Sequence, residues 1–121
     1  MKILGTGIDI IEVKRVKNQL ENNNAFKKRV FTEGEIAYCE KKKRKFEHYA
    51  VRFAAKEAVW KAMGKGGIGL RSIEVKNKVS GRPEVYFKGR KIKEKVLISL
   101  SHCEDYAVAQ AIIYKELSKK S

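Results

Sequence analysis

The sequence predicts an α+β protein in which a long helix packs on an antiparallel sheet. Three observations support this: an apolar stretch at residues 2–13, helical signals over residues 14–63 and strand-like runs over residues 72–114. Strands that alternated with helices would instead predict a parallel sheet. The 121 residues suit one domain covering residues 1–121, and 43% hydrophobic residues provide a core of modest size.

Strand signals stand at both ends of the chain. Residues 2–13 are rich in Ile and Val, which predicts a buried strand. Within it, Gly5 and Gly7 allow a close backbone approach or a bulge. Four later runs also have strand character, at residues 72–79, 84–87, 96–101 and 106–114. We expect the last two runs to pair antiparallel across a short turn.

Helical signals fill the segment between these strands. We expect helices over residues 14–21, 25–30, 33 to about 42, and 46–63. Thr32 and Glu35 have the spacing of a capping box, which marks the start of the third helix. Gly64 follows the last helix in the position of a C-terminal capping glycine.

The charge of the chain limits the class of its partners. There are 28 Lys and Arg against 14 Asp and Glu, a net charge of +14. This implies a polyanionic partner: a nucleic acid, a phosphorylated cofactor, an anionic membrane or an acidic protein. No run approaches the roughly 20 apolar residues of a membrane span, and no signal-peptide cleavage site follows the N-terminal stretch. We therefore expect a cytoplasmic protein.

Glu57 falls among apolar side chains of the long helix. With about 100° per residue, it shares an arc with Phe46, Tyr49, Ala50, Phe53 and Trp60. A carboxylate on a core-facing stripe loses hydration worth several kcal/mol unless a cation or hydrogen-bond donors replace the water. The pattern therefore indicates either a bound cation with a chemical role, or an internal salt bridge to Lys61 or Lys56.

Asp9 is a second carboxylate in apolar surroundings, because isoleucines flank it on both sides. It either faces solvent at a strand end or joins Glu57 in holding a hard divalent cation. Mg²⁺ is the natural candidate, since it uses one or two carboxylates and takes its other ligands from waters and substrate phosphates. Lys61, one turn beyond Glu57, either binds a phosphate at the same site or is an ordinary surface lysine.

Other segments offer groups for binding anions. The run GKGGIG at residues 64–69 permits a nest of backbone N–H groups, or is a simple turn between helix and strand. His102 either donates to a phosphate oxygen or is a plain turn residue, and the lack of a GxSxG motif argues against nucleophilic serine chemistry. A dense basic patch is either a solvated face or a docking surface for an acidic partner; it comprises Lys14, Arg15, Lys17, Lys27, Lys28 and Arg29.

Four blocks of the sequence resemble the holo-acyl-carrier-protein synthases, the small single-domain class of 4′-phosphopantetheinyl transferases. The blocks are GTGIDIIEVKR at 5–15, RFAAKEAVWKAMGKG at 52–66, SGRPEV at 80–85 and SLSHCEDYAVAQ at 99–110. The resemblance implies the family's fold and a homotrimer with sites between subunits. It also implies transfer of the phosphopantetheine arm of coenzyme A to a serine of apo-acyl carrier protein, with release of adenosine 3′,5′-bisphosphate, in fatty acid biosynthesis.

The resemblance further implies roles for single residues. Asp9 and Glu57 would be the Mg²⁺ ligands. Glu57 and Lys61 would be catalytic, with Glu57 or a water that it orients as the base. The coenzyme A contacts would come from Arg52, Lys61, Gly64, Gly66 and His102, of which Arg52 and His102 would bind the adenosine end and its 3′-phosphate. The acidic recognition helix of the carrier would meet Lys14, Arg15, Lys28 and Arg29.

Two other functions compete with this one. A small nucleic-acid-binding module would explain the charge, but it predicts aromatic platforms interleaved with basic residues or a recognisable RNA- or DNA-binding fold. The sequence has neither, so we expect no nucleic-acid partner. A non-catalytic oligomeric scaffold would leave Asp9 and Glu57 without a purpose.

Overall fold

The computed structural model describes residues 1–64, 69–88 and 92–117. Its first half holds one strand and four helices: β1 (Lys2–Glu12), α1 (Val13–Asn22), α2 (Asn24–Val30), α3 (Glu33–Glu40) and α4 (Lys45–Met63). A short 3-10 helix and four strands follow: η1 (Leu70–Ser72), β2 (Ile73–Asn77), β3 (Pro83–Phe87), β4 (Lys95–His102) and β5 (Tyr106–Lys115). The predicted α+β class and the order of elements are confirmed.

The strands form two antiparallel sheets. In the larger one β5 lies between β1 and β4, and Asp9 of β1 stands opposite Ala109. The smaller sheet pairs β2 with β3. The four later strands therefore do not share one sheet, because β2 and β3 pair only with each other, and β1 from the start of the chain joins β4 and β5. The antiparallel pairing predicted for the last two strands is confirmed.

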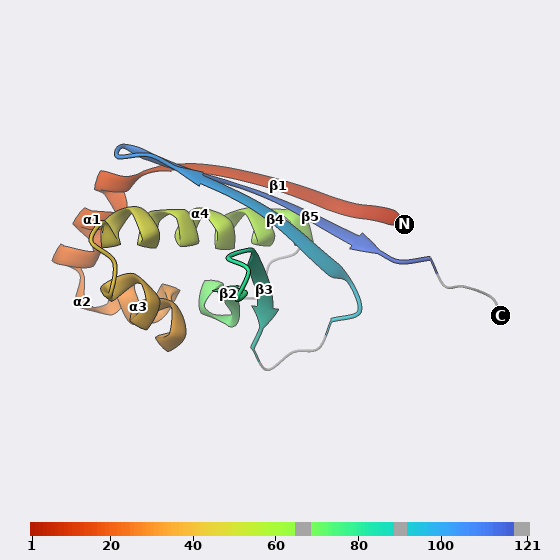
Figure 1. Cartoon of the computed structure of the whole chain (residues 1–121), viewed down its shortest axis with the longest axis horizontal. Coiled ribbons are helices and arrows are strands. Elements are labelled where there is room, and N and C mark those ends of the chain that lie inside the picture. Colours follow the sequence, from red (N-terminus) through yellow and green to blue (C-terminus); the bar gives the residue numbers. More distant parts are fainter. Residues whose placement is uncertain (65–68, 89–91, 118–121) are drawn as a thin grey trace.

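Helix α4 lies between two layers of the molecule. The three-stranded sheet covers one side of the helix, while α2, α3 and the small sheet lie on the other side (Figure 1). Because layers cover the helix from both sides, buried side chains occur on nearly every side of α4. Among the helices that the structure describes, none is long and apolar enough to cross a membrane.

Two glycines bring β1 directly onto the backbone of α4. A Cβ atom at Gly7 would lie 1.9 Å from the carbonyl oxygen of Ala58, and one at Gly5 would lie 2.0 Å from that of Ala62. Neither position has room for a side chain. The strand also shifts register between Ile3 and Gly5. Both expectations for these glycines, a close approach and a bulge, are confirmed.

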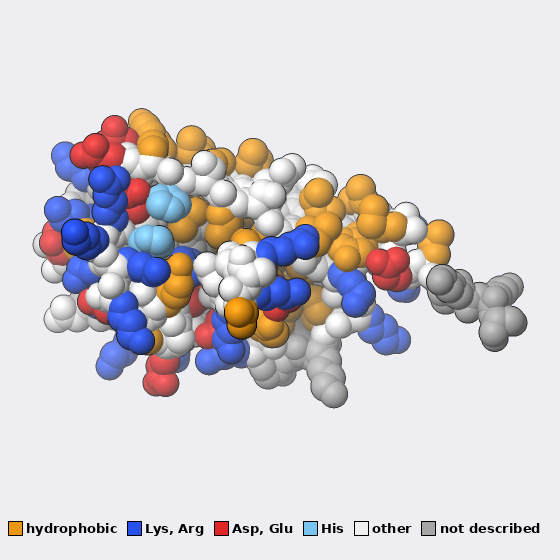
Figure 2. Space-filling view, in the orientation of Figure 1, with side chains coloured by type: hydrophobic (Ala, Val, Ile, Leu, Met, Phe, Trp, Pro, Cys, Tyr) orange, Lys and Arg blue, Asp and Glu red, His pale blue; other side chains and the backbone are white. Residues whose placement is uncertain are grey.

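The opposite face of β1 is open, so the prediction of a buried strand was wrong for that face. Ile8 and Ile10 are 64% and 66% exposed, whereas Gly7 is buried and Asp9 half-buried. The reason is that α4 covers only one face of the sheet. Figure 2 shows hydrophobic side chains along the border of the molecule where this sheet lies.

The prediction that Glu57 lies on the core-facing stripe of α4 was also wrong. The helix presents small residues to the sheet, and these are fully or almost fully buried: Ala54, Ala55, Ala58 and Ala62. In the predicted arc, Tyr49 and Ala50 are buried, but Phe46, Phe53 and Glu57 are only partly buried and Trp60 is 38% exposed. Small side chains are needed where a strand approaches closely, so the large aromatic residues lie on the less covered side.

A buried ion pair joins the layer beneath α4 to the helix. Lys56 Nζ lies 2.6 Å from Glu35 Oε1 and donates to the carbonyl oxygens of Val30 and Leu70 at 2.7 and 3.0 Å. Glu35 also completes the capping box predicted with Thr32. These contacts offset the desolvation cost of the two charges, and burial still lowers the pKa of Lys56 below its usual value.

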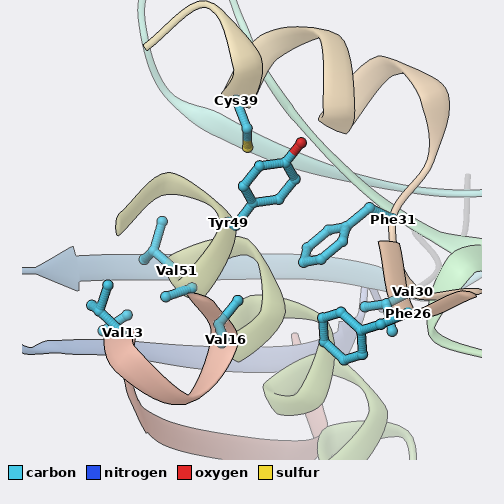
Figure 3. Packing of buried hydrophobic residues seen from close by; sticks show 10 residues of the cluster. Val13, Val16, Phe26, Val30, Phe31, Cys39, Tyr49 and Val51 are labelled. Carbon is cyan, nitrogen blue, oxygen red and sulfur yellow. The ribbon is translucent and has the colours of Figure 1, made fainter. Parts of the chain in front are cut away.

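An aromatic cluster fixes α1, α2 and α3 against α4 (Figure 3). The rings of Phe31 and Tyr49 meet edge to face with centroids 5.0 Å apart, and Phe26 packs against Phe31 at 6.2 Å. Tyr49 keeps its hydroxyl at the border of the cluster, where it donates to Glu40 Oε2 at 2.6 Å. Cys39 lies in the same cluster, and its burial raises the pKa of the thiol to about 12.

Replacing Gly7 by Ala tests the contact between β1 and α4. The new methyl group would force the strand off the helix, so Gly7→Ala should lower the free energy of unfolding by about 3 kcal/mol or more. Urea unfolding measures the change. Gly69→Ala is the matched control, because a Cβ there meets nothing within 4 Å, and it should change stability by less than about 0.5 kcal/mol. Equal stability of the two variants would contradict the contact.

Candidate functional site

Asp9 and Lys61 form an ion pair at the β1 edge of the sheet. Lys61 Nζ donates to Asp9 Oδ1 at 3.1 Å and to the carbonyl oxygen of Ile8 at 3.0 Å. The Asp9 side chain is only 17% exposed, because it lies on the face of β1 that packs against α4. The alternative of a solvent-facing aspartate at a strand end is therefore wrong, and Lys61 is more than an isolated surface charge.

Glu57 is the third member of this cluster, and it forms no salt bridge with either lysine that the sequence suggested. Neither salt bridge considered for it is formed, since Lys61 pairs with Asp9 and Lys56 with Glu35. Burial raises the pKa of the Glu57 carboxyl above its usual value, the negative charge of Asp9 raises it further, and Lys61 opposes both effects. Glu57 therefore lies close enough to Asp9 and Lys61 for their charges to act on it, and the cluster of two carboxylates and one lysine carries more negative than positive charge.

The cluster fits a divalent cation that takes part of its coordination shell from a substrate. Carboxylate oxygens suit Mg²⁺, which binds through one or two of them and completes its shell with waters and phosphates. Among the residues that the structure describes, no group of three or more His, Cys, Asp or Glu side chains is placed to hold a metal ion. Asp9 and Glu57 would therefore hold a metal as a pair.

Arg52 and His102 lie together in a second cluster. They line a hollow of about 400 Å³ between α3, α4, β4 and the β2–β3 turn. Arg52 is 3% exposed, and it donates from Nη2 to Asn77 Oδ1 at 3.0 Å, while its guanidinium lies 3.9 Å from the ring centre of Tyr38. Both contacts are with uncharged groups, and the buried Nε has no hydrogen-bond partner. None of these contacts of Arg52 neutralises its charge.

Sequence reasoning missed two residues of this second cluster. Glu47 accepts a hydrogen bond from His102 Nδ1 at 2.8 Å when that nitrogen is protonated. The ring of His48 lies 5.3 Å from that of His102, and both histidines appear on one face in Figure 2. Burial lowers the pKa of His48, and the nearby His102 and Arg52 lower it further. The spacing of Glu47 and His48 on α4 gives no signal, because their partner lies 55 positions from Glu47 on β4.

The two clusters lie on opposite flanks of α4. Asp9 is on β1 and His102 on β4, the two outer strands of the sheet. On the helix, Arg52 and Glu57 are five positions and therefore about 140° apart. A single chain thus brings together Asp9, Glu57 and Lys61, and separately Arg52 and His102, but it does not bring the two groups into one site.

The glycine-rich segment is only partly described. Gly64 caps α4 in the left-handed conformation, with φ of 67°, as predicted. Gly66 lies outside the described residues, as do its neighbours from 65 to 68, so the expected nest remains a prediction. The basic patch is exposed on α1 and α2, at Lys14, Arg15, Lys28 and Arg29. Figure 2 shows Lys and Arg side chains gathered at that end of the molecule.

Known proteins match this chain along most of its length. A family model described as the 4′-phosphopantetheinyl transferase superfamily matches residues 5–111. The holo-[acyl-carrier-protein] synthase of Clostridium tetani is 50% identical, over 94% of this chain and 98% of its own. That of Chloroherpeton thalassium is 49% identical, over 88% of this chain and 94% of its own.

Solved structures agree with the sequence matches. A holo-(acyl-carrier-protein) synthase from Bacillus anthracis, in complex with CoA (3′,5′-ADP), superposes with a TM-score of 0.83 and 37% identity, covering 96% of this chain and all of its own. The Helicobacter pylori enzyme in complex with coenzyme A gives a TM-score of 0.76 and 26% identity, over 89% of this chain and 98% of its own.

Replacing Glu57 by Gln tests whether the carboxylate pair holds a metal. The amide keeps the shape but removes one charge, so Mn²⁺ should bind roughly tenfold more weakly or worse, since even groups that only orient a metal ligand change affinity by roughly 10–100-fold. The electron paramagnetic resonance signal of free Mn²⁺ measures the affinity. Glu12→Gln, which removes an exposed carboxylate further along β1, is the control. Equal Mn²⁺ affinity of all three proteins would remove Glu57 from the metal site.

Proposed function

The chain belongs to the 4′-phosphopantetheinyl transferase superfamily, and we propose that it transfers the 4′-phosphopantetheine arm of coenzyme A to a serine of apo-acyl carrier protein. Adenosine 3′,5′-bisphosphate is the other product. The observation that supports this most is the near full-length identity of 50% to a holo-[acyl-carrier-protein] synthase. The reaction would serve fatty acid biosynthesis in the cytoplasm.

Arg52 and His102 are proposed to bind the adenosine end of coenzyme A and its 3′-phosphate. A phosphate needs charged donors, and Arg52 offers a buried guanidinium whose Nε is unpartnered. The hollow beside it is bordered by Asn77, Ser99 and the turn at Gly81, all able to contact a nucleotide. A relative that adopts the same fold was solved in complex with CoA (3′,5′-ADP), which supports coenzyme A as the ligand. Gly64 and Gly66, at and just after the end of α4, are proposed as further contacts.

Asp9 and Glu57 would hold Mg²⁺ next to the pyrophosphate of coenzyme A. When bound, the ion supplies positive charge that neutralises the diphosphate. Lys61 now pairs with Asp9 at 3.1 Å, and its half-exposed side chain can turn from the carboxylate to a phosphate oxygen. There its ammonium group would stabilise the charge that develops on the leaving phosphate.

The carrier serine would attack the β-phosphorus of coenzyme A in line with the leaving phosphate. The hydroxyl loses a proton as the new bond forms, and Glu57, or a water molecule that it orients, is placed to take it. The bond between the β-phosphorus and the bridging oxygen breaks, so that adenosine 3′,5′-bisphosphate leaves. Glu57 and Lys61 are therefore the proposed catalytic residues.

A complete site would need two copies of the chain, because the two clusters lie on opposite flanks of α4. The exposed sheet face offers an apolar surface for such an assembly, with Ile8 and Ile10 on β1 and Leu97 on β4. Exposed apolar patches commonly mark contacts between subunits. A head-to-tail contact that closes into a ring would place the carboxylate cluster of one copy beside the arginine cluster of the next. The proposed ring is the homotrimer that the resemblance implies.

The carrier is proposed to dock on α1 and α2. Lys14, Arg15, Lys28 and Arg29 are exposed there, and a positive surface both steers an acidic partner and fixes its orientation. The same charges were the whole argument for a nucleic-acid-binding module. No feature of the described residues favours that alternative over docking of an acidic carrier.

Mass spectrometry of an apo-acyl carrier protein tests the proposed reaction. After incubation with this protein, coenzyme A and Mg²⁺, the carrier should gain the mass of one phosphopantetheine arm, and a chelator should prevent the gain. A carrier whose acceptor serine is replaced by alanine is the control. An unchanged carrier mass in the presence of well-folded protein and Mg²⁺ would overturn the proposal.

A further inference from the structure

Glu47 is a buried carboxylate to which the proposed reaction gives no role. It lies in the first turn of α4 and is 7% exposed. Its Oε1 lies 2.8 Å from His102 Nδ1, and its Oε2 lies 3.5 Å from Arg44 Nη1. A carboxylate near a helix N-terminus is favourable in itself. That effect does not require a histidine of another element at hydrogen-bonding distance.

The hydrogen bond between His102 and Glu47 determines which ring nitrogen of His102 remains to donate to a ligand. A carboxylate only accepts, so His102 uses its Nδ1–H to bond to Glu47. In the neutral ring with Nδ1 protonated, Nε2 carries no hydrogen and would repel a phosphate oxygen. In the imidazolium, Nε2 also carries a hydrogen and can donate to a phosphate. Phosphate binding through Nε2 therefore requires a hydrogen on both ring nitrogens, a form in which Nδ1–H can still donate to Glu47.

The other groups around His102 are not carboxylates. From α4, His48 lies 5.3 Å away between ring centres, and Arg52 lines the same hollow. From α3, the hollow is bordered by Tyr38, and from the β2–β3 segment by Asn77, Gly81 and Pro83. Glu47 itself lines another hollow beside α1, which it shares with Glu104 and Asp105 of the acidic turn after β4, and it reaches His102 from there. Among the described residues that line the hollow or bond to His102, Glu47 is the only carboxylate.

We propose that Glu47 is a positioning residue that makes the site selective for a nucleotide with a 3′-phosphate. It orients the His102 ring through the 2.8 Å contact at Nδ1, so that Nε2 and the guanidinium of Arg52 can both bind one anion in the hollow. Without Glu47, nothing among the described residues would hold the imidazole by a side-chain hydrogen bond. The inference rests on the proposed function, because it assumes that the hollow receives the adenosine end of coenzyme A.

Coenzyme A and 3′-dephospho-coenzyme A differ only in the 3′-phosphate, so a comparison of their affinities tests the inference. Isothermal titration calorimetry without carrier measures both affinities. Glu47→Gln should weaken coenzyme A binding about tenfold, the effect expected for loss of a charge-assisted hydrogen bond. It should change 3′-dephospho-coenzyme A binding less than twofold.

Two further variants separate positioning from a structural effect. Glu40→Gln is the matched control, since Glu40 also accepts hydrogen bonds from side chains of α4, but its partners are Lys45 and Tyr49 and not His102; its selectivity should be unchanged. In a His102→Ala background, Glu47→Gln should have no further effect on selectivity, because Glu47 acts through the imidazole. If Glu47→Gln does not fold, Glu47→Asp, whose carboxylate is one methylene shorter, should give an intermediate selectivity.

The outcomes distinguish this inference from the proposed function. If the unaltered protein binds neither ligand, the proposed function fails. If it binds both and Glu47→Gln keeps the full selectivity, or if Glu47→Gln lowers selectivity equally with and without His102, Glu47 has no positioning role and the proposed function stands.

Discussion

The candidate site depends on the direct contact between the backbone of β1 and that of α4. Gly5 and Gly7 allow it, because any Cβ atom there would overlap the carbonyl oxygens of Ala62 and Ala58. The next residue on the same face of β1 is Asp9, whose carboxylate consequently reaches the flank of α4 that carries Lys61. The packing that stabilises the sheet on the helix is therefore also what gathers the carboxylate cluster.

Helix α4 keeps two kinds of chemistry apart. One flank, with Glu57 and Lys61, carries excess negative charge together with Asp9 and suits a divalent cation. The other flank, with Arg52, presents a positive charge that its uncharged neighbours do not neutralise. Because the helix separates them, the proposed substrate, with a diphosphate and a phosphorylated ribose, would engage both clusters only across a boundary between copies.

The sequence allowed many of the local features to be predicted. The capping box at Thr32 and the left-handed glycine at Gly64 are short-range signals, and both are confirmed. Asp9 and Glu57, both singled out from the sequence, lie in one cluster with Lys61, but the argument for Glu57 was wrong, since its arc of α4 is the less covered one. The angular positions of the residues around the helix could not show that two layers enclose α4, nor that its alanine face makes the tightest contact.

Contacts between distant segments, such as Lys56 with Glu35 and Glu47 with His102, left no periodic signal in the sequence. The metal, the roles of the site residues and the homotrimer stay predictions.

Subunit complementation tests most directly the central claim that the site forms between copies. Glu57→Gln disables the carboxylate cluster and Arg52→Met disables the arginine cluster. Each variant alone should transfer almost no phosphopantetheine. Unfolding and refolding an equal mixture would form mixed rings, in which about one quarter of the boundaries join two intact clusters. The account predicts that transferase activity returns to about that fraction of the unaltered protein. If the mixed rings form and the mixture stays as inactive as its components, each chain builds its site alone, and the account is contradicted.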